Sequence, residues 1–188
     1  MSECSTINSR ALHGKMVQVL FGKKVNKGYR MTDCQKMEQL IRDECAKQGV
    51  TNESHIAYMV ATAMWETNHT CKPVKEAYWL SEDWRNKHLR YYPYFGRGLI
   101  QITLKENYEK FSKLLDIDLV NYPDRALDED IAVKILVIGM RDGLFTGKSL
   151  QDFTDAQGNI DFYEARRIVN GLDKASTIAS MAQEICHV

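Results

Sequence analysis

The chain has 188 residues, of which 44% are hydrophobic and 27% are charged. This is the composition of a folded globular protein, and it excludes disorder as the main state of the chain. Lys and Arg together number 25, as do Asp and Glu, so the formal net charge is zero. A dedicated nucleic-acid-binding protein usually carries a basic surplus, so nucleic acid is not an expected partner. At this length we expect one domain over residues 1–188, present as a monomer.

Cysteine usage and the N-terminal segment bear on the compartment of the protein. The five cysteines are Cys4, Cys34, Cys45, Cys71 and Cys186. Their odd number and irregular spacing make a poor disulfide framework, so free thiols in a reducing compartment are expected. The only apolar run near the N-terminus, from Met16 to Phe21, is too short for a signal peptide or a membrane span. We therefore expect synthesis in the cytoplasm without a signal peptide, and no integral membrane segment.

Helical periodicity dominates the chain beyond residues 1–30, which are the least regular part. Ser54 and Asp128 are expected to cap helices. Helices are predicted over about 33–49, 54–66, 105–115, 131–140, 161–169 and 173–186. Residues 68–98 are polar, aromatic and irregular, and residues 98–102 could form a short strand or begin a helix. Because strand signal is weak throughout, the predicted fold class is mainly α, in a single domain.

The first candidate for chemistry is Glu66, in the segment Ala-Met-Trp-Glu-Thr at residues 63–67. On a helical wheel it lies beside Met59 and Ala63, at the edge of the apolar face and near the C-terminal end of the helix. Partial burial and the negative end of the helix dipole both favour the protonated carboxyl, which is the form that a general acid needs. The ordinary alternative is a surface glutamate at a helix end.

A second carboxylate, Glu76, follows ten positions later. Two carboxylates that flank a sugar bond are the minimum set for glycoside hydrolysis. Seven aromatic residues follow among polar ones: Tyr78, Trp79, Trp84, Tyr91, Tyr92, Tyr94 and Phe95. Their ring faces could stack on sugars along a cleft wall, although a place in the core is the alternative for each of them.

The third segment, YFGRGLIQIT at residues 94–103, combines glycines with polar groups. Its two glycines permit close backbone approach, and Arg97 between them could pair with a buried carboxylate. Gln101, Thr103 and Asn107 are polar side chains close to apolar neighbours, so each needs a hydrogen-bonding partner. A substrate or a catalytic water could be that partner.

These segments resemble motifs of glycoside hydrolase family 19. YFGRGLIQIT with Asn107-Tyr108 is similar to the family's Gly-Arg-Gly-x-Ile-Gln-Leu-Thr/Ser segment and its following Asn-Tyr. Trp-Glu-Thr at 65–67 is similar to the family's His-Glu-Thr-Gly, and residues 166–171 are similar to its late segment ending in Ile-Asn-Gly. Order and rough spacing agree over about residues 55–180. The short bacterial and phage lysozyme-like members are more similar than the secreted, disulfide-bonded plant chitinases.

The resemblance implies an α-rich, lysozyme-like catalytic domain with a deep substrate cleft and inversion at the anomeric carbon. Glu66 then corresponds to the general acid and Glu76 to the base that activates water, as in the short phage-type members. Thr103 and Asn107 match the positions that hold the water and the substrate. The remaining expected substrate contacts are Tyr78, Gln101, Asn170 and Arg167, of which Arg167 could orient a carboxylate.

The sequence departs from the family pattern directly around the predicted acid. Trp65 stands where His is usual, and Asn68-His69 stand where Gly-Gly is usual. The loop after the acid can therefore run differently, and Glu82 is a reserve candidate for the base.

Other chemistries have weaker support. His69, Cys71 and His88 match no standard zinc spacing, so no metal and no cofactor are expected. Cys71 paired with a histidine would be a thiol hydrolase, but no cysteine-peptidase signature surrounds it. The expected function is a glycosidase that cuts β-1,4 bonds of peptidoglycan, with chitin as the alternative substrate. A lytic transglycosylase and a catalytically inactive wall-binding module are further alternatives.

The biological role expected for such a glycosidase is a phage or prophage endolysin, released to the wall by a holin, or an effector exported by a dedicated route. Residues 10–30 carry six basic side chains and no acidic one, whereas residues 116–130 carry six acidic side chains against Arg125. Because bacterial walls are anionic, the basic segment could guide the enzyme to its polymer. A solvated surface is the alternative for that segment.

Overall fold

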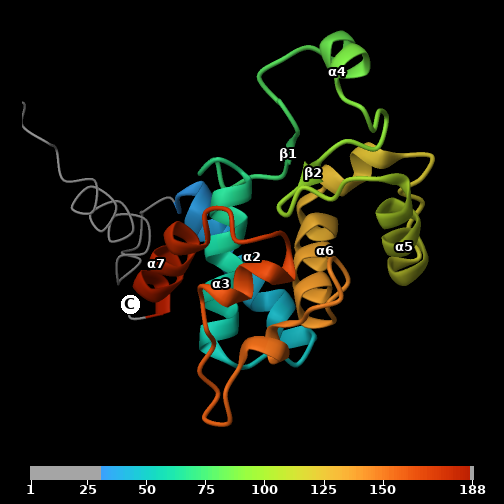
Figure 1. The fold of residues 1–188 in the computed structure, drawn as a ribbon. Helices are drawn as coiled ribbons and strands as arrows, with labels where there is room; N and C mark the ends of the chain where they lie inside the picture. The colour runs from blue at the N-terminus through green and yellow to red at the C-terminus, as the bar shows by residue number, and fades with distance from the viewer. Residues whose placement is uncertain (1–30, 187–188) are drawn as a thin grey trace, which may run out of the picture.

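Four helices form the core of the protein in residues 31–186, the part that the computed structural model describes (Figure 1). They are α2 (Asp33–Lys47), α3 (Glu53–Glu66), α6 (Glu129–Arg141) and α7 (Ala175–Cys186). Helix α3 packs against α7, α2 and α6, and α2 also packs against α6. All four helices were predicted from the sequence. The irregular, basic segment of residues 1–30 lies outside the described residues.

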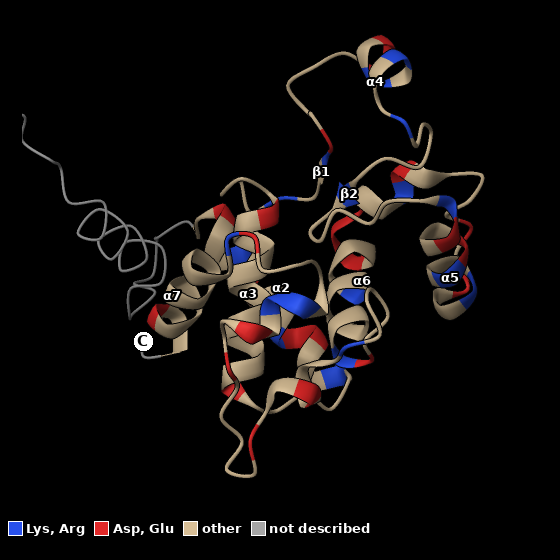
Figure 2. Cartoon of the chain, in the orientation of Figure 1, with Lys and Arg blue, Asp and Glu red and all other residues tan. Residues whose placement is uncertain are grey.

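Helix α3 is buried along most of its length, and this burial determines where Glu66 lies. Every residue from Ile56 to Met64 is buried. The helix is charged only at its ends, at Glu53 and Glu66 (Figure 2). A helix that is apolar on all sides needs neighbours all around it, which α2, α6 and α7 supply. Glu66 is therefore the residue at which the central helix of the core reaches the surface.

Caps explain where the first helices begin. Thr32 and Gln35 form a capping box at the start of α2, with each side chain bonded to the backbone of the other residue. At α3, Asn52 Oδ1 accepts hydrogen bonds from the backbone N–H groups of Ser54 and His55. The predicted cap at Ser54 is therefore wrong by two residues. Asp128 occupies the expected cap position of α6, but its side chain makes no capping hydrogen bond.

The segment predicted to be irregular, residues 68–98, contains a small sheet and a helix. Strands β1 (Val74–Lys75) and β2 (Arg97–Gly98) pair antiparallel, with Val74 opposite Gly98. Between them the chain extends outward to α4 (Glu82–His88) and returns (Figure 1). Helix α5 (Lys105–Leu115), which was predicted, follows the sheet. The chain then continues through the 3₁₀ helix η1 (Pro123–Leu127) into α6.

The late part of the chain is less helical than the sequence indicates. Residues 161–169 were predicted to be a helix, but only a short 3₁₀ helix, η3 (Glu164–Ile168), forms there. A second 3₁₀ helix, η2 (Leu150–Phe153), packs against η3. The mainly α fold class is confirmed. No helix in residues 31–186 is both long enough and apolar enough to cross a bilayer.

A disulfide joins Cys34, at the start of α2, to Cys71, in the loop that follows α3. The expectation that these thiols are free is therefore wrong, because folding brings together two cysteines that are 37 positions apart. The bond also removes Cys71 as a candidate nucleophile or metal ligand. Cys45 and Cys186 remain free, and burial raises the pKa of the Cys45 thiol to about 11. The disulfide attaches the loop after Glu66 to α2.

Candidate active site

Glu66 is held by an arginine from a distant part of the chain. Its side chain is 18% exposed, and its Oε1 lies 2.7 Å from Arg166 Nη1 in η3. Arg166 is buried, and its Nε donates to the backbone carbonyl of Asp173 at 3.1 Å. A charged hydrogen bond from a buried, anchored guanidinium fixes the direction of the carboxyl. Glu66 is thus oriented and still reached by solvent.

The arginine selected from the sequence was the neighbouring one. Arg167 is exposed, and its Nε binds Glu164 Oε2 at 2.7 Å, one turn away on the same short helix. Arg166, which the sequence did not single out, takes the orienting role. Consecutive residues of a helix point in different directions, so only one of the two arginines can face α3. The Arg-Arg pair itself gives no signal of which one does.

Helix α3 carries two further polar side chains on the same face as Glu66. Tyr58 and Thr62 precede it at intervals of four residues, on the same face of the helix, and both are fully buried. Burial raises the pKa of Tyr58, while the nearby Arg166 charge opposes that rise. Arg166 therefore lies close to a water-poor region of the core, where its attraction for Glu66 is only weakly screened.

The second carboxylate, Glu76, is fixed by the backbone of the sheet. Its N–H donates to the Gly96 carbonyl at 2.7 Å, and the Gly96 N–H donates to Glu76 Oε2 at 2.9 Å. A Cβ at Gly96 would lie 3.3 Å from Glu76 Oε2 and 2.8 Å from Gln101 Oε1. The glycine therefore lets a carboxylate oxygen and an amide oxygen approach the same point of the backbone.

Three of the predicted site residues continue this arrangement toward α5. Gln101 Nε2 donates to the Val74 carbonyl at 2.9 Å, so the side chain spans from its turn to β1. The Thr103 hydroxyl donates to the Gln101 carbonyl at 3.0 Å, and Asn107 Nδ2 donates to the Thr103 carbonyl at 2.7 Å. These contacts place Gln101, Thr103 and Asn107 in one hydrogen-bonded chain beside the second carboxylate.

The predicted residues therefore form two groups on either side of a loop. Asn170 belongs with Glu66, because its backbone N–H donates to the Arg166 carbonyl at 3.0 Å. Residues 67–75 connect this group to the second one, which holds Glu76. Figure 1 shows α3 and α7 on one side of α6, α5 on the other, and the sheet near the upper end of α6. The loop is fixed at Cys71, which has a positive φ and forms the disulfide with α2.

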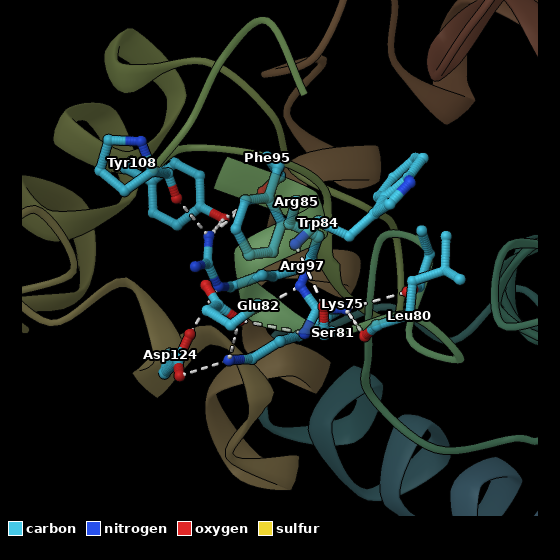
Figure 3. Close-up of polar contacts among 12 residues, drawn as sticks. Lys75, Leu80, Ser81, Glu82, Trp84, Arg85, Phe95, Arg97, Tyr108 and Asp124 are labelled. Atoms are coloured by element: carbon cyan, nitrogen blue, oxygen red, sulfur yellow. Dashed lines mark hydrogen bonds and ion pairs between the residues drawn. The ribbon is translucent and has the colours of Figure 1, made fainter. Parts of the chain in front are cut away.

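Glu82, the reserve candidate for the base, is occupied elsewhere. Its Oε2 accepts hydrogen bonds from Arg85 at 3.0 Å and from Lys75 at 3.4 Å (Figure 3). Arg85 is buried and also donates to the backbone carbonyls of Ala77 and Leu80. Glu82 therefore neutralises the cation that holds the loop before α4.

The Arg97 side chain connects β2 to η1 and to the Phe95 ring. It is buried, its Nε lies 2.8 Å from Asp124 Oδ1, and its guanidinium stacks 3.8 Å from the centre of the Phe95 ring (Figure 3). The predicted pairing with a carboxylate is present, but that carboxylate is 58% exposed. Burial would raise the pKa of Asp124, yet hydrogen bonds from Lys75 and Arg97 outweigh it and hold that pKa below its ordinary value.

The seven aromatic residues divide between core and surface. Phe95 is fully buried, while Trp84 and Tyr94 are partly buried. Four are exposed and available for stacking: Tyr78, Trp79, Tyr91 and Tyr92. The Tyr78 ring meets the Trp79 ring edge to face, and no hydrogen bond among residues 31–186 joins Tyr78 to either carboxylate. Residues 31–186 hold no cluster of three or more metal-ligating side chains.

Comparison with solved structures finds a similar fold in one protein. The fold is similar to chitinase C from Streptomyces griseus HUT6037, with a TM-score of 0.57 over 100% of this chain and 80% of that one. The two sequences are 15% identical, so the likeness shows the fold alone. A mutant of chitinase C aligns over 92% of this chain and 91% of that one, at 14% identity and a TM-score of 0.47. No family model and no curated protein matches the sequence.

Proposed function

We propose that the chain is a glycoside hydrolase that cleaves β-1,4 bonds in the glycan strands of peptidoglycan, with inversion. The ion pair between Glu66 and Arg166 is the observation that carries the proposal. Arg166 binds one carboxyl oxygen of Glu66, and the other oxygen, Oε2, forms no hydrogen bond with residues 31–186. An oriented carboxyl with one open oxygen can, when it carries a proton on that oxygen, pass the proton to a leaving glycosidic oxygen.

Glu76 is suited to the complementary role of the base. The Gly96 N–H fixes its Oε2, and Oε1 forms no hydrogen bond within residues 31–186 and can accept a proton from water. The Thr103 hydroxyl donates its hydrogen bond to the Gln101 carbonyl, so the lone pairs of the Thr103 oxygen can accept a hydrogen bond from the same water. An inverting enzyme keeps its carboxyl groups about 6.5 to 9.5 Å apart to admit that water.

Chitin is the second candidate substrate. The chitinase fold favours it, since the structural neighbour is named for that polymer. Peptidoglycan stays first because the sequence motifs are most similar to those of short lysozyme-like members. The two polymers share β-1,4-linked N-acetylglucosamine, so one pair of carboxyl groups could serve both.

The disulfide bears on where the enzyme would act. Disulfides persist in oxidising surroundings and are rare in the cytosol of most organisms. The Cys34–Cys71 bond therefore supports the proposal that the enzyme acts at the cell wall, outside the reducing compartment. We propose that the protein acts as an endolysin, made in the cytoplasm and released through a holin, or as an effector sent out by a dedicated export route.

Mass spectrometry of digests of purified peptidoglycan and of chitin tests the proposal. New reducing ends are expected from the wild-type chain, and Glu66→Gln should give none while remaining folded, although loss of the charge that pairs with buried Arg166 should lower its melting temperature. Anhydro-muramic ends would indicate a lytic transglycosylase instead. Binding of the polymer with no product from the wild type would indicate a wall-binding module. Products from Glu66→Gln at the wild-type rate would disprove the role of Glu66.

A further inference from the structure

A hollow of about 550 Å³ lies between η1 and the segment that precedes β2. We call it the η1 groove and define it by Tyr92, Pro93, Tyr122, Pro123, Arg125 and Asp128. It is a surface feature that the catalytic proposal does not use.

Neither Glu76 nor Gly96, which contacts it, is among the residues that line the η1 groove. Lys75 and Arg97 are cross-strand partners, and both side chains reach Asp124, at 2.7 and 2.8 Å. Asp124 borders the groove. Glu76 follows Lys75 in a turn, and its carboxylate accepts a hydrogen bond from the Gly96 N–H. A ligand in the groove would therefore contact residues other than Glu66 and Glu76.

Two exposed tyrosine rings line the groove. Tyr122 is 63% exposed and Tyr92 is 40% exposed, and a proline follows each of them. The Tyr92 ring stacks on the buried Phe95, with 6.0 Å between ring centres, so the core supports an exposed ring. Tyrosine rings offer an apolar face for stacking and a hydroxyl for hydrogen bonds. Both groups match the alternating C–H and hydroxyl surface of a sugar.

The charges around the groove nearly cancel. The carboxylates of Glu82 and Asp124 are already paired with cations of β1, β2 and α4 (Figure 3). Arg125 and Asp128 add one charge of each sign. A groove without a strong net charge favours a neutral, hydroxyl-rich ligand over a polyanion or a cationic peptide.

We propose that the η1 groove is a second saccharide-binding surface, which takes a stretch of β-1,4-linked N-acetylated hexose chain. The identity of the sugar rests on the proposed function, because the groove would hold the polymer that the active site cuts. Binding at two separate surfaces raises the time that the enzyme spends on an insoluble polymer without adding a catalytic group.

Co-sedimentation with purified peptidoglycan and with chitin tests the groove. All variants carry Glu66→Gln, so that the polymer stays intact. Adding Tyr122→Ala is expected to weaken binding about fivefold to tenfold, the effect of losing one aromatic stacking contact. Tyr122→Phe should retain most of the binding, because it keeps the ring. Leu114→Ala, which removes a side chain of similar exposure from α5, is the control and should bind like the parent.

The test separates the groove from the catalytic proposal. With Glu66 intact, Tyr122→Ala should hydrolyse a short soluble N-acetylglucosamine oligomer at the parental rate, because such a substrate spans only the active site. Equal sedimentation of Tyr122→Ala and its parent, or a parent that sediments with neither polymer, would disprove saccharide binding by the η1 groove. An intact chain that binds polymer through Tyr122 but yields no products would instead overturn the proposed hydrolase.

Discussion

Arg166 Nη1 lies 2.7 Å from Glu66 Oε1, although 100 positions separate the two residues. The contact joins the end of the central core helix to a short 3₁₀ helix and sets the direction of the predicted acid. Because Arg166 is buried and anchored to the Asp173 carbonyl, it cannot follow Glu66 if that side chain moves. The orientation of Glu66 therefore depends on how η3 packs.

Replacement of Arg166 by lysine tests this dependence. Lysine keeps the charge but loses the planar fork, so Glu66 should be misdirected. We expect kcat on a soluble oligosaccharide to fall at least about tenfold with little change in KM. The matched variant Arg167→Lys, which alters only an exposed pair with Glu164, should stay near the wild type. Equal losses in the two variants would contradict the role of Arg166.

The choice of base can be decided with two substitutions of the same kind. Glu76→Gln should lower kcat by roughly 10² to 10⁴, because the amide cannot take a proton from water. Glu82→Gln should leave kcat nearly unchanged and lower the melting temperature, because it weakens the pairing with buried Arg85. Rate measurements together with thermal melts separate the two effects. A large fall in kcat for Glu82→Gln alone would reverse the assignment.

Gly96 offers a steric test of the arrangement that holds Glu76 and Gln101 in place. An alanine methyl there would lie 2.8 Å from Gln101 Oε1 and 3.3 Å from Glu76 Oε2, so both side chains must shift. We expect Gly96→Ala to cost about 1 to 3 kcal/mol of stability, as overpacking usually does, and to lower kcat about tenfold or more. Urea denaturation and steady-state kinetics give the two values. Normal kcat in this variant would show that Glu76 need not hold its present position.

The sequence predicted the helices better than it predicted the contacts between them. The apolar pattern around Ile56 and Met59 is strong enough to locate α3, and therefore Glu66, without knowledge of the rest of the fold. Two-residue strands have no periodicity to detect, so β1 was missed and β2 was indicated only as a short strand or helix start at residues 98–102, even though their pairing positions Glu76. These strands form because the segment that contains Gly96 and Gly98 folds back and pairs with the segment that follows α3.

Long-range partners were the other part that the sequence could not provide. Cys34 and Cys71 carry no spacing signature, and only the packing of α2 beside the end of α3 brings them together. Likewise, Arg167 was selected from the sequence, but the direction in which each arginine leaves η3 places Arg166, and not Arg167, on Glu66. Glu82 was a reasonable reserve for the base until α4, which periodicity had not indicated, placed it on Arg85.

Asp124 gives a prediction about pH. Burial raises the pKa of Asp124, but the hydrogen bonds from Lys75 and Arg97 lower it by more, so the pKa lies below its ordinary value. A carboxyl with a lowered pKa stabilises the fold above its unfolded pKa of about 3.9 and loses that effect as the pH falls through the folded value. Asp124→Asn should therefore melt a few degrees below the wild type at neutral pH. The difference should disappear in melts well below about pH 4, and a difference that stays constant with pH would contradict the pairing.

The disulfide gives the last prediction, because it encloses both α2 and α3. Closing a loop between residues 37 positions apart reduces the entropy of the unfolded chain, by about 3 to 4 kcal/mol at 25 °C. The double variant Cys34→Ser with Cys71→Ser should lose stability of that order in urea denaturation, whereas Cys186→Ser should lose little. A reductant should lower the stability of the wild type to that of the double variant and leave the double variant unchanged. Because the same bond fixes the loop between Glu66 and Glu76, kcat should fall together with stability. A wild type that is indifferent to reductant in both measurements would mean that the Cys34–Cys71 bond contributes to neither.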